Sequence, residues 1–373
     1  MPVAAVLLVV AVVIASDPRP GQGITSSAPT VSATPAASST SAASQTTAPR
    51  ELSARNAVVI AASLQRLTFA RETDGTRVGD IDVRSGVFAI SPDATRVAYL
   101  VGPDAEIWVA DVAHIDRAQR VLSVAPLVAT GLVWSTDGKG ILFSTRTREQ
   151  VPGPEGEPLQ VTLEGIHLDA NRRELFWEQP QVSVHPLLWV REPKTVTAVF
   201  GAGQRGPSQY LAVSAGGARS WAIPDATRLE VSVGSFLPSS NGRWVAALYH
   251  YGSRALIRIW PAEDFASTVE LDSPGADVRS VMWRPGGLEI AVDAGGVLEL
   301  WTRDGTRRRV ADLGGRFLSA FRWDGSAIYA GSLTGQAELI EVDTGRHVQL
   351  PGIISTISSG PFGTGIVASA RLE

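Results

Sequence analysis

One pattern, repeated along most of the chain, restricts the fold more than any other feature of the sequence. It is a short apolar stretch, a turn of the Ser-Pro-Asp-Gly kind and a second apolar stretch, as in Phe88 to Leu100, FAISPDATRVAYL. The turns follow seven anchor positions that lie 38 to 55 residues apart: Ile90, Trp134, Trp189, Leu237, Trp283, Phe321 and Ser359. Repeats of about 45 residues with several strands each are typical of β-propellers.

Each repeat continues with two further strand-like stretches. The third alternates apolar and polar residues, as in Leu256 to Trp260 and Val297 to Trp301, and this period of two is typical of a strand with unlike faces. A fourth follows a turn that contains Gly or Asp, as in Gly345 to Leu350. The sequence therefore predicts an all-β fold, a seven-bladed β-propeller of four-stranded antiparallel blades.

The seventh repeat is incomplete, because the chain ends just after its apolar stretch at Gly365 to Ala370. Residues 67–83 closely parallel residues 298–313, and both contain Asp-Gly-Thr-Arg. We therefore expect the ring to be closed by N-terminal strands that join the C-terminal half-blade, two strands from each end. The place of Ala57 to Ala62 stays open at this stage.

The N-terminus carries an apolar run from Pro2 to Ala15. A helix of that length covers roughly 22 Å, less than the roughly 30 Å hydrocarbon core of a bilayer. Residues 1–16 are therefore expected to form a signal peptide or N-terminal membrane segment, with Val13 to Ala15 as a cleavage site. No Lys or Arg precedes the run, which leaves two alternatives: a weak signal anchor, or a start inside a longer transmembrane helix.

Residues 17–50 are rich in Ser, Thr, Ala and Pro, with 13 Ser or Thr among the 25 residues from Ile24 to Ala48. Such a composition buries too little apolar surface to offset its ordering entropy, so a disordered stalk is expected. The propeller is expected over residues 51–373. This order predicts an extracytoplasmic module that is anchored to the cell membrane by its N-terminal segment or secreted.

The Ser-Pro-Asp turns, followed by an apolar strand and one like Ile107-Trp108-Val109, resemble the TolB-like, or PD40, relatives of WD40 propellers. With the stalk and membrane segment, the chain is similar to extracytoplasmic actinobacterial propellers, such as the C-terminal domain of LpqB-type lipoproteins. The resemblance covers about residues 57–373. It implies the fold but not the activity, because one fold hosts many functions.

The sequence gives little sign of catalysis. Cysteine is absent, which excludes a thiolate metal site and a cysteine nucleophile. No Gly-x-Ser-x-Gly elbow or phosphate-binding loop occurs, and the five histidines lack metal-ligand spacing. We expect no catalytic residues, metal or cofactor. The net charge of −4 gives no general nucleic-acid footprint.

The tryptophans recur at equivalent positions of the repeats, so we expect them to pack between blades rather than to bind a ligand. The basic run Arg307 to Arg309 is expected to be the solvated face of an outer strand.

One insertion departs from the repeat. Arg146 to Gln160 lengthens the second unit between its second and third strands, and its three prolines disfavour helix and strand alike. A tolerated surface insertion is one interpretation. The other is a contact surface, with four charged candidates for ligand binding: Arg148, Glu149, Glu155 and Glu157.

Three functional hypotheses follow. The first is a monomeric, non-catalytic binding module for a protein, peptide or envelope-polymer partner, in a sensor or scaffold role. The second is a propeller enzyme, of the lyase, cyclotransferase or quinoprotein type, with His, Arg and carboxylates at the channel mouth. The third is an intracellular WD40-type scaffold, which the stalk disfavours.

Overall fold

A computed structural model describes residues 57–63, 66–83, 87–102, 106–125, 127–146, 159–181, 183–201, 209–223, 236–251, 254–273, 278–332, 337–352 and 365–372. The chain divides into two units, and all described residues belong to the unit that holds Ala54–Glu373. The predicted segments 1–16 and 17–50 lie outside the described residues. The boundaries predicted for these two segments and for the propeller therefore lie outside them as well. Within the described residues, no helix is long and apolar enough to cross a membrane.

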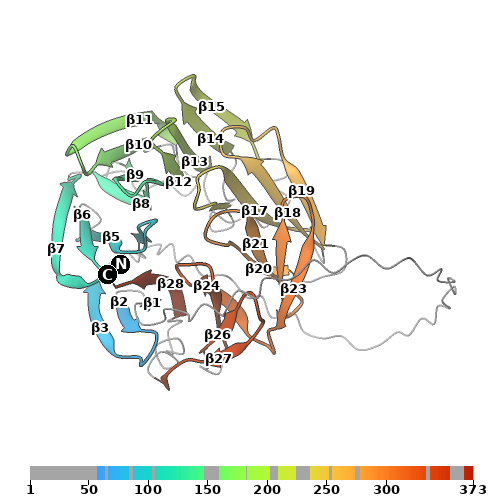
Figure 1. The fold of residues 1–373 in the computed structure, drawn as a ribbon. Helices are drawn as coiled ribbons and strands as arrows, with labels where there is room; N and C mark the ends of the chain where they lie inside the picture. Colours follow the sequence, from blue (N-terminus) through green and yellow to red (C-terminus); the bar gives the residue numbers. More distant parts are fainter. Residues whose placement is uncertain are drawn as a thin grey trace, which may run out of the picture. The chain divides into compact units, whose positions relative to one another are not determined.

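The described elements are β-strands that form seven four-stranded sheets, arranged as the blades of a ring (Figure 1). We number the blades in chain order and list their strands from the channel outward. Blade 1 holds β4 (Phe88–Ile90), β5 (Arg96–Val101), β6 (Glu106–Asp111) and β7 (His114–Ser123). Blade 2 holds β8 (Val128–Trp134), β9 (Gly140–Arg146), β10 (Leu159–His167) and β11 (Arg172–Gln181). Blade 3 holds β12 (Ser183–Val190), β13 (Thr195–Gly201), β14 (Gln209–Ser214) and β15 (Gly217–Ala222).

The remaining blades repeat this order. Blade 4 holds β16 (Phe236–Pro238), β17 (Trp244–Tyr251), β18 (Arg254–Pro261) and β19 (Val269–Ser273). Blade 5 holds β20 (Val278–Trp283), β21 (Glu289–Ala294), β22 (Val297–Thr302) and β23 (Arg307–Asp312). Blade 6 holds β24 (Phe317–Phe321), β25 (Ala327–Gly331), β26 (Ala337–Glu341) and β27 (His347–Gln349). Blade 7 holds β28 (Gly365–Arg371), β1 (Ala57–Ala62), β2 (Arg66–Arg71) and β3 (Arg77–Asp82).

The predicted seven-bladed, all-β propeller is therefore confirmed, and so is the completion of the last blade by N-terminal strands. The predicted division of that blade is wrong, because the C-terminus supplies one strand and the N-terminus three. Strand β1 pairs with β2 on one side and with β28 on the other, so it is the second strand of blade 7. The stretch Gly365–Arg371 is the innermost strand, and the turn predicted before it, at residues 360–363, lies outside the described residues.

Seven clusters of buried apolar side chains form the core, one at each interface between neighbouring blades. The tryptophans contribute to these interfaces, as the repeat pattern predicted. Trp134 of blade 2 donates its indole N–H to the carbonyl of Ala89 in blade 1, at 2.9 Å. Trp283 of blade 5 donates in the same way to Leu237 of blade 4, at 2.7 Å. Each ring thus buries apolar area and ties two blades together.

The turn between the first and second strands of a blade, called the inner turn here, is built in the same way in several blades. In blade 1, the Ser91 hydroxyl donates to Asp93 and accepts the backbone N–H of Arg96. Ser135 with Asp137 and Ser239 with Asn241 repeat this arrangement in blades 2 and 4. The residue after the acidic or amide position has a positive φ, which explains the frequent Gly there.

A buried polar cluster joins blade 6 to the closing blade. Arg322, at the start of the inner turn of blade 6, is 0% exposed and lies 3.6 Å from the carboxylate of Glu72, which is 5% exposed. The Tyr329 hydroxyl of β25 donates to Glu72 and lies 3.4 Å from Ser369 of β28. Burial raises the pKa of Glu72 despite the Tyr329 hydrogen bond and the Arg322 charge. These residues come from blade 6 and from both chain ends.

We expect Arg322→Met to lower the free energy of unfolding by about 3 to 5 kcal/mol, because it leaves the Glu72 carboxylate buried without its cation. The double variant Arg322→Met with Glu72→Gln should recover at least about 1 kcal/mol of that loss. Denaturant unfolding measures both. Arg309→Met, in a pair whose side chains are 62% and 70% exposed, is the control and should change stability by less than about 0.5 kcal/mol. Strictly additive effects at Arg322 and Glu72 would contradict this assignment.

Candidate functional site

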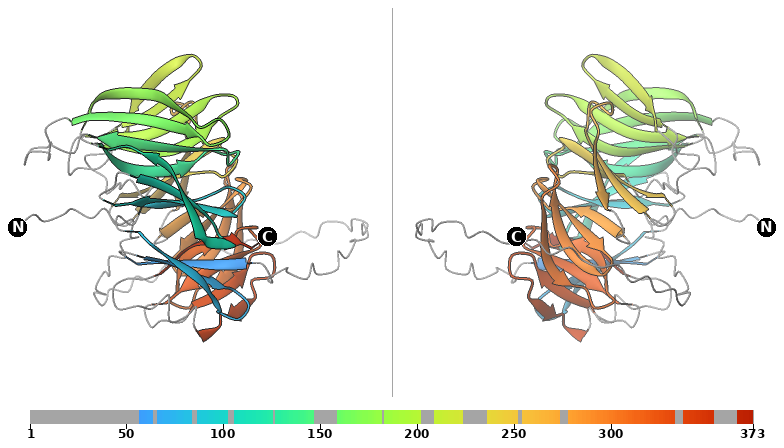
Figure 2. Two further views of the ribbon diagram at one scale, coloured as in Figure 1. Left: turned by 90° about the vertical axis from the view of Figure 1, so that its left-hand side faces the viewer. Right: turned by 90° about the vertical axis from the view of Figure 1, so that its right-hand side faces the viewer.

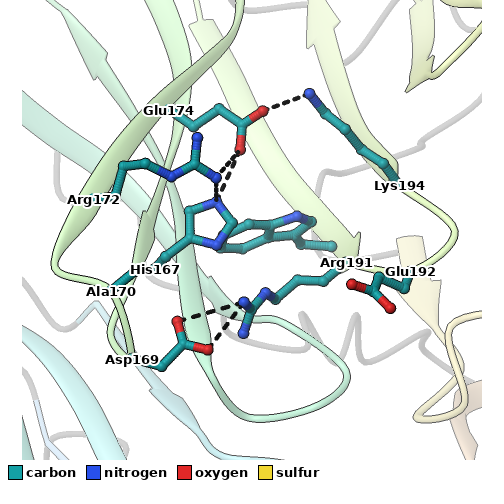
Figure 3. Close-up of a pocket in the computed structure, with 9 residues that line it drawn as sticks. His167, Asp169, Ala170, Arg172, Glu174, Arg191, Glu192 and Lys194 are labelled. Atoms are coloured by element: carbon teal, nitrogen blue, oxygen red, sulfur yellow. Dashed lines mark hydrogen bonds and ion pairs between the residues drawn. The ribbon is translucent and has the colours of Figure 1, made fainter.

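The candidate site lies where blade 2 meets blade 3. Two turns form it: the turn between β10 and β11, which is the outer turn of blade 2, and the inner turn of blade 3 (Figures 1 and 3). The inner turn of blade 2 is joined directly to the end of β12, because Ser135 forms a parallel bridge with Trp189 and Thr136 N donates to Trp189 O at 2.8 Å. Backbone hydrogen bonds therefore hold the two blades in register at this place.

Trp189 forms the wall between the blades and is 1% exposed. Its ring packs against blade 2 at two positions that have no side chain, Gly140 and Gly165. A Cβ at Gly140 would overlap the ring, and a Cβ at Gly165 would lie 2.8 Å from it. The His167 ring meets Trp189 edge-on, with ring centroids 4.9 Å apart. Two glycines in adjacent strands thus leave the space that a tryptophan from the next blade fills.

A cavity of about 520 Å³ opens beside this wall. Besides Trp189, it is lined from blade 2 by His167, Asp169, Ala170, Arg172 and Glu174. From blade 3 it is lined by Arg191, Glu192 and Lys194. A second cavity of about 410 Å³ shares Asp169, Arg191 and Glu192 with the first and adds Thr136, Asp137 and Lys139. Because three residues are common to both, the cavities form one groove with two compartments, within the size range of small-molecule sites.

The Glu174 carboxylate organises one side of the groove (Figure 3). It accepts from Lys194 Nζ at 2.6 Å and lies 2.8 Å from His167 Nε2, while Arg172 Nη2 is 3.5 Å away. Burial raises the pKa of Glu174, but the hydrogen bonds from Lys194 and His167 outweigh it and hold the pKa below its usual value. Arg172 Nη2 also lies 3.2 Å from His167 Nε2, so the three side chains meet at one point.

Arg191 organises the other side (Figure 3). Its guanidinium lies 3.1 Å from Asp169 and 3.2 Å from Asp137, so it bridges the outer and inner turns of blade 2. The hydrogen bond from Arg191 lowers the pKa of Asp169. Burial raises the pKa of Asp137, but hydrogen bonds from Ser135 and Lys139 and the Arg191 charge lower it overall. Both carboxylates are therefore ionised acceptors at neutral pH.

These contacts show what the groove can do chemically. Among the described residues that line the first compartment, none carries a hydroxyl or thiol that could act as a nucleophile. The pKa values of Asp169 and Glu174 are lowered, whereas an efficient general base has a pKa near the working pH. No group of His, Cys, Asp and Glu among the described residues has the arrangement of a metal site. The groove therefore presents charged hydrogen-bond donors and acceptors to solvent.

The four predicted contact residues, Arg148, Glu149, Glu155 and Glu157, lie outside the described residues. The insertion that carries them joins the ends of β9 and β10 at which Arg146 pairs with Val161. The groove lies at the opposite ends of the same strands, where Gly140 pairs with His167. The strand ends that the insertion joins and the strand ends beside the groove are therefore opposite ends of blade 2.

The groove was not predicted from the sequence, because the five histidines, His167 among them, lack metal-ligand spacing along the chain. Two signals could have indicated it. The inner turn of blade 3 replaces Ser-Pro-Asp-Gly with Val190-Arg191-Glu192-Pro193, a charged variant. In addition, Gly140 and Gly165 stand in neighbouring apolar strands, where a missing side chain indicates close approach of another group.

The predicted solvated face at Arg307–Arg309 is confirmed, since these residues open the outermost strand of blade 5 and are exposed. Arg308 nevertheless donates to the Val342 carbonyl of blade 6 at 3.1 Å, so part of the run serves blade packing.

Comparisons with known proteins agree with the fold. No family model matches the chain, and no curated protein does. An oligogalacturonate lyase in complex with manganese has a similar structure, with 14% identity and a TM-score of 0.56 over 77% of this chain and 83% of that one. Apo AztD from Citrobacter koseri has 10% identity and a TM-score of 0.51 over 85% and 98%. TolB from Acinetobacter baumannii has 16% identity and a TM-score of 0.44 over 68% and 63%. At such identities the likeness concerns the propeller fold alone.

The close packing of Trp189 against Gly140 predicts that a larger residue at position 140 lowers stability. We expect Gly140→Ala to lower the free energy of unfolding by about 1 to 3 kcal/mol, because the new methyl group meets the indole ring and the Ile166 carbonyl. Gly216→Ala is the matched control, since its nearest atom would lie 3.6 Å away. Thermal unfolding compares the two. Equal stability of both variants would show that Trp189 does not need this space.

The groove also predicts a dependence on pH. A carboxylate whose pKa is lowered in the folded state stabilises the fold above its unfolded pKa, and that contribution disappears as the pH falls through the folded pKa. Glu174→Gln should therefore be less stable than the native chain by about 1 kcal/mol at pH 7, and the gap should close below about pH 4.5. Unfolding curves from pH 7 to pH 3 measure the gap. A gap that widens on acidification would contradict the ionised state of Glu174.

Proposed function

We propose that this chain is a non-catalytic binding module, and that the groove between blades 2 and 3 holds a polar ligand. One observation carries the proposal: within the groove, most charged side chains are paired with one another rather than directed at a reacting group. Glu174 is paired with Lys194 and His167, and Arg191 is paired with Asp169 and Asp137. Such mutual pairing fixes the orientation of donors and acceptors before a ligand arrives, which favours recognition.

The alternative is a propeller enzyme of the lyase, cyclotransferase or quinoprotein type with a site at the channel mouth. His167, Arg172 and Glu174 do converge, as an enzyme of that kind requires. They lie, however, at the third and fourth strands of blade 2, away from the first strands that surround the channel. The lowered pKa of Glu174 also makes it a weak base. Binding without turnover therefore accounts for the groove better.

The proposed location is extracytoplasmic, with the protein either anchored to the cell membrane by its N-terminal segment or secreted. The apolar run Pro2 to Ala15 and the following Ser/Thr-rich stretch support it. The resemblance to LpqB-type propellers belongs to the same proposal. In this setting the monomeric propeller would act as a sensor or scaffold for a protein, peptide or envelope polymer.

A second contact surface is proposed at the insertion, through Arg148, Glu149, Glu155 and Glu157. Its support is the sequence: a polar, proline-rich departure from the repeat that joins two adjacent strands of blade 2. Because it joins the strand ends opposite to the groove, the two surfaces can be tested separately.

The test uses the full chain, immobilised and exposed to a native envelope fraction. Two variants accompany it: Val151 to Pro158 replaced by a Gly-Ser turn, and the combined substitution Glu174→Gln with Lys194→Met. We expect the native chain to retain an envelope component unchanged in mass, and the groove variant to lose it. Loss in the insertion variant alone would transfer the site to the insertion. Retention by both variants, or chemical conversion by the native chain but not by the groove variant, would contradict the proposal.

A further inference from the structure

We propose that the ligand of the groove is electrically neutral and rich in hydroxyl groups, such as a free sugar or a sugar unit of a polymer. The inference rests on the proposed binding function and narrows it to a chemical class. It is carried by the balance of charges in the groove and by the hydrogen-bonding capacity that the paired side chains retain.

Charges of opposite sign are balanced across the two compartments. The cations are Lys139, Arg172, Arg191 and Lys194, and the carboxylates are Asp137, Asp169, Glu174 and Glu192. The first compartment alone holds three of each. Because the groove has no net charge, it does not attract a charged ligand over long range.

An anionic ligand is disfavoured by the groups already in place. Arg191 and Lys194 already hold the ionised carboxylates of Asp169 and Glu174, so an anion bound to either cation would lie beside a second negative charge. Glu192, which has no hydrogen bond or ion pair with another described residue, would repel it as well (Figure 3). A cationic ligand would be repelled by Arg172 and Lys194, whose side chains are 61% and 40% exposed.

A hydroxyl group fits the same side chains without displacing any of them. Lys194 has three N–H donors and uses one of them on Glu174, and the contacts of Arg172 involve Nη2 alone among its guanidinium nitrogens. The carboxylates of Asp137 and Asp169 keep free lone pairs beside Arg191. Because a hydroxyl both donates and accepts, neighbouring hydroxyls on one ring can bridge a cation and its carboxylate. Hydrogen bonds to charged partners are the stronger ones.

Shape agrees with this chemistry. The two compartments share Asp169, Arg191 and Glu192, so a ligand longer than one ring can continue from one to the other. Trp189 is too buried to offer a face for stacking, so recognition depends on hydrogen bonds. Weak binding with little response to salt follows from this.

The experiment is calorimetric titration of the full chain with defined probes. The neutral probes are maltohexaose, cellohexaose and chitohexaose, the anionic ones a galacturonate hexamer and a heparin hexasaccharide. We expect one neutral probe to bind, with a dissociation constant that changes less than about twofold between 50 and 300 mM NaCl. Glu174→Gln with Lys194→Met should weaken that binding at least about tenfold. The control, Arg66→Gln with Asp82→Asn, removes an exposed pair of blade 7 and should leave it unchanged.

Other results overturn the inference in ways that can be told apart. Binding of an anionic probe that weakens steeply with salt and is lost in the groove variant would refute the neutral class but keep the binding function. Absence of binding by every neutral probe would refute the class directly. Neutral binding that the groove variant does not weaken would refute the groove as the site, and with it the site assigned under the proposed function.

Discussion

Every blade of this propeller depends on its two neighbours, because the apolar clusters lie between blades. A sheet with two apolar faces is stable only when both are covered, so the row of blades has to return to its beginning. Strand β28 meets that requirement by pairing with β1, and β1 in turn pairs with β2. The cluster of Arg322, Glu72 and Tyr329 adds a buried polar contact at the same junction. Closure is therefore the condition on which all other interfaces rest.

The inner turns provide a second level of order. Arg96 donates to the Gly138 carbonyl, Asn241 to Gly286 and Arg284 to Gly325, so turns of adjacent blades are joined around one face of the ring. The candidate groove arises where this pattern changes. In blade 3 the turn carries Arg191 and Glu192, and the arginine reaches back to two carboxylates of blade 2. A local exception in a repeated turn thus produces a charged groove on an otherwise regular scaffold.

The sequence predicted the blades well, because the turn chemistry and the alternation of apolar residues are local. Ser91, Ser135 and Ser239 all form the hydrogen bonds that their motif implies. The division of the closing blade was not predictable in the same way, since Gly365–Arg371 is a short run of small and apolar residues that suits either an innermost or a second strand. The groove depends on contacts between residues far apart in sequence, such as Arg191 with Asp137, so no local pattern shows it. The charged turn of blade 3 and the glycines Gly140 and Gly165 were its two traces in the sequence.

We propose that recognition occurs between blades 2 and 3, on the side of the inner turns. Hydrogen exchange of the full chain, with and without a bound neutral oligosaccharide, tests this most directly, because it reports on every backbone segment at once. We expect slower exchange at residues 168–172 and 190–195, which form the two turns of the groove. Protection confined to the innermost strands at the channel, or to residues 147–158, would contradict it.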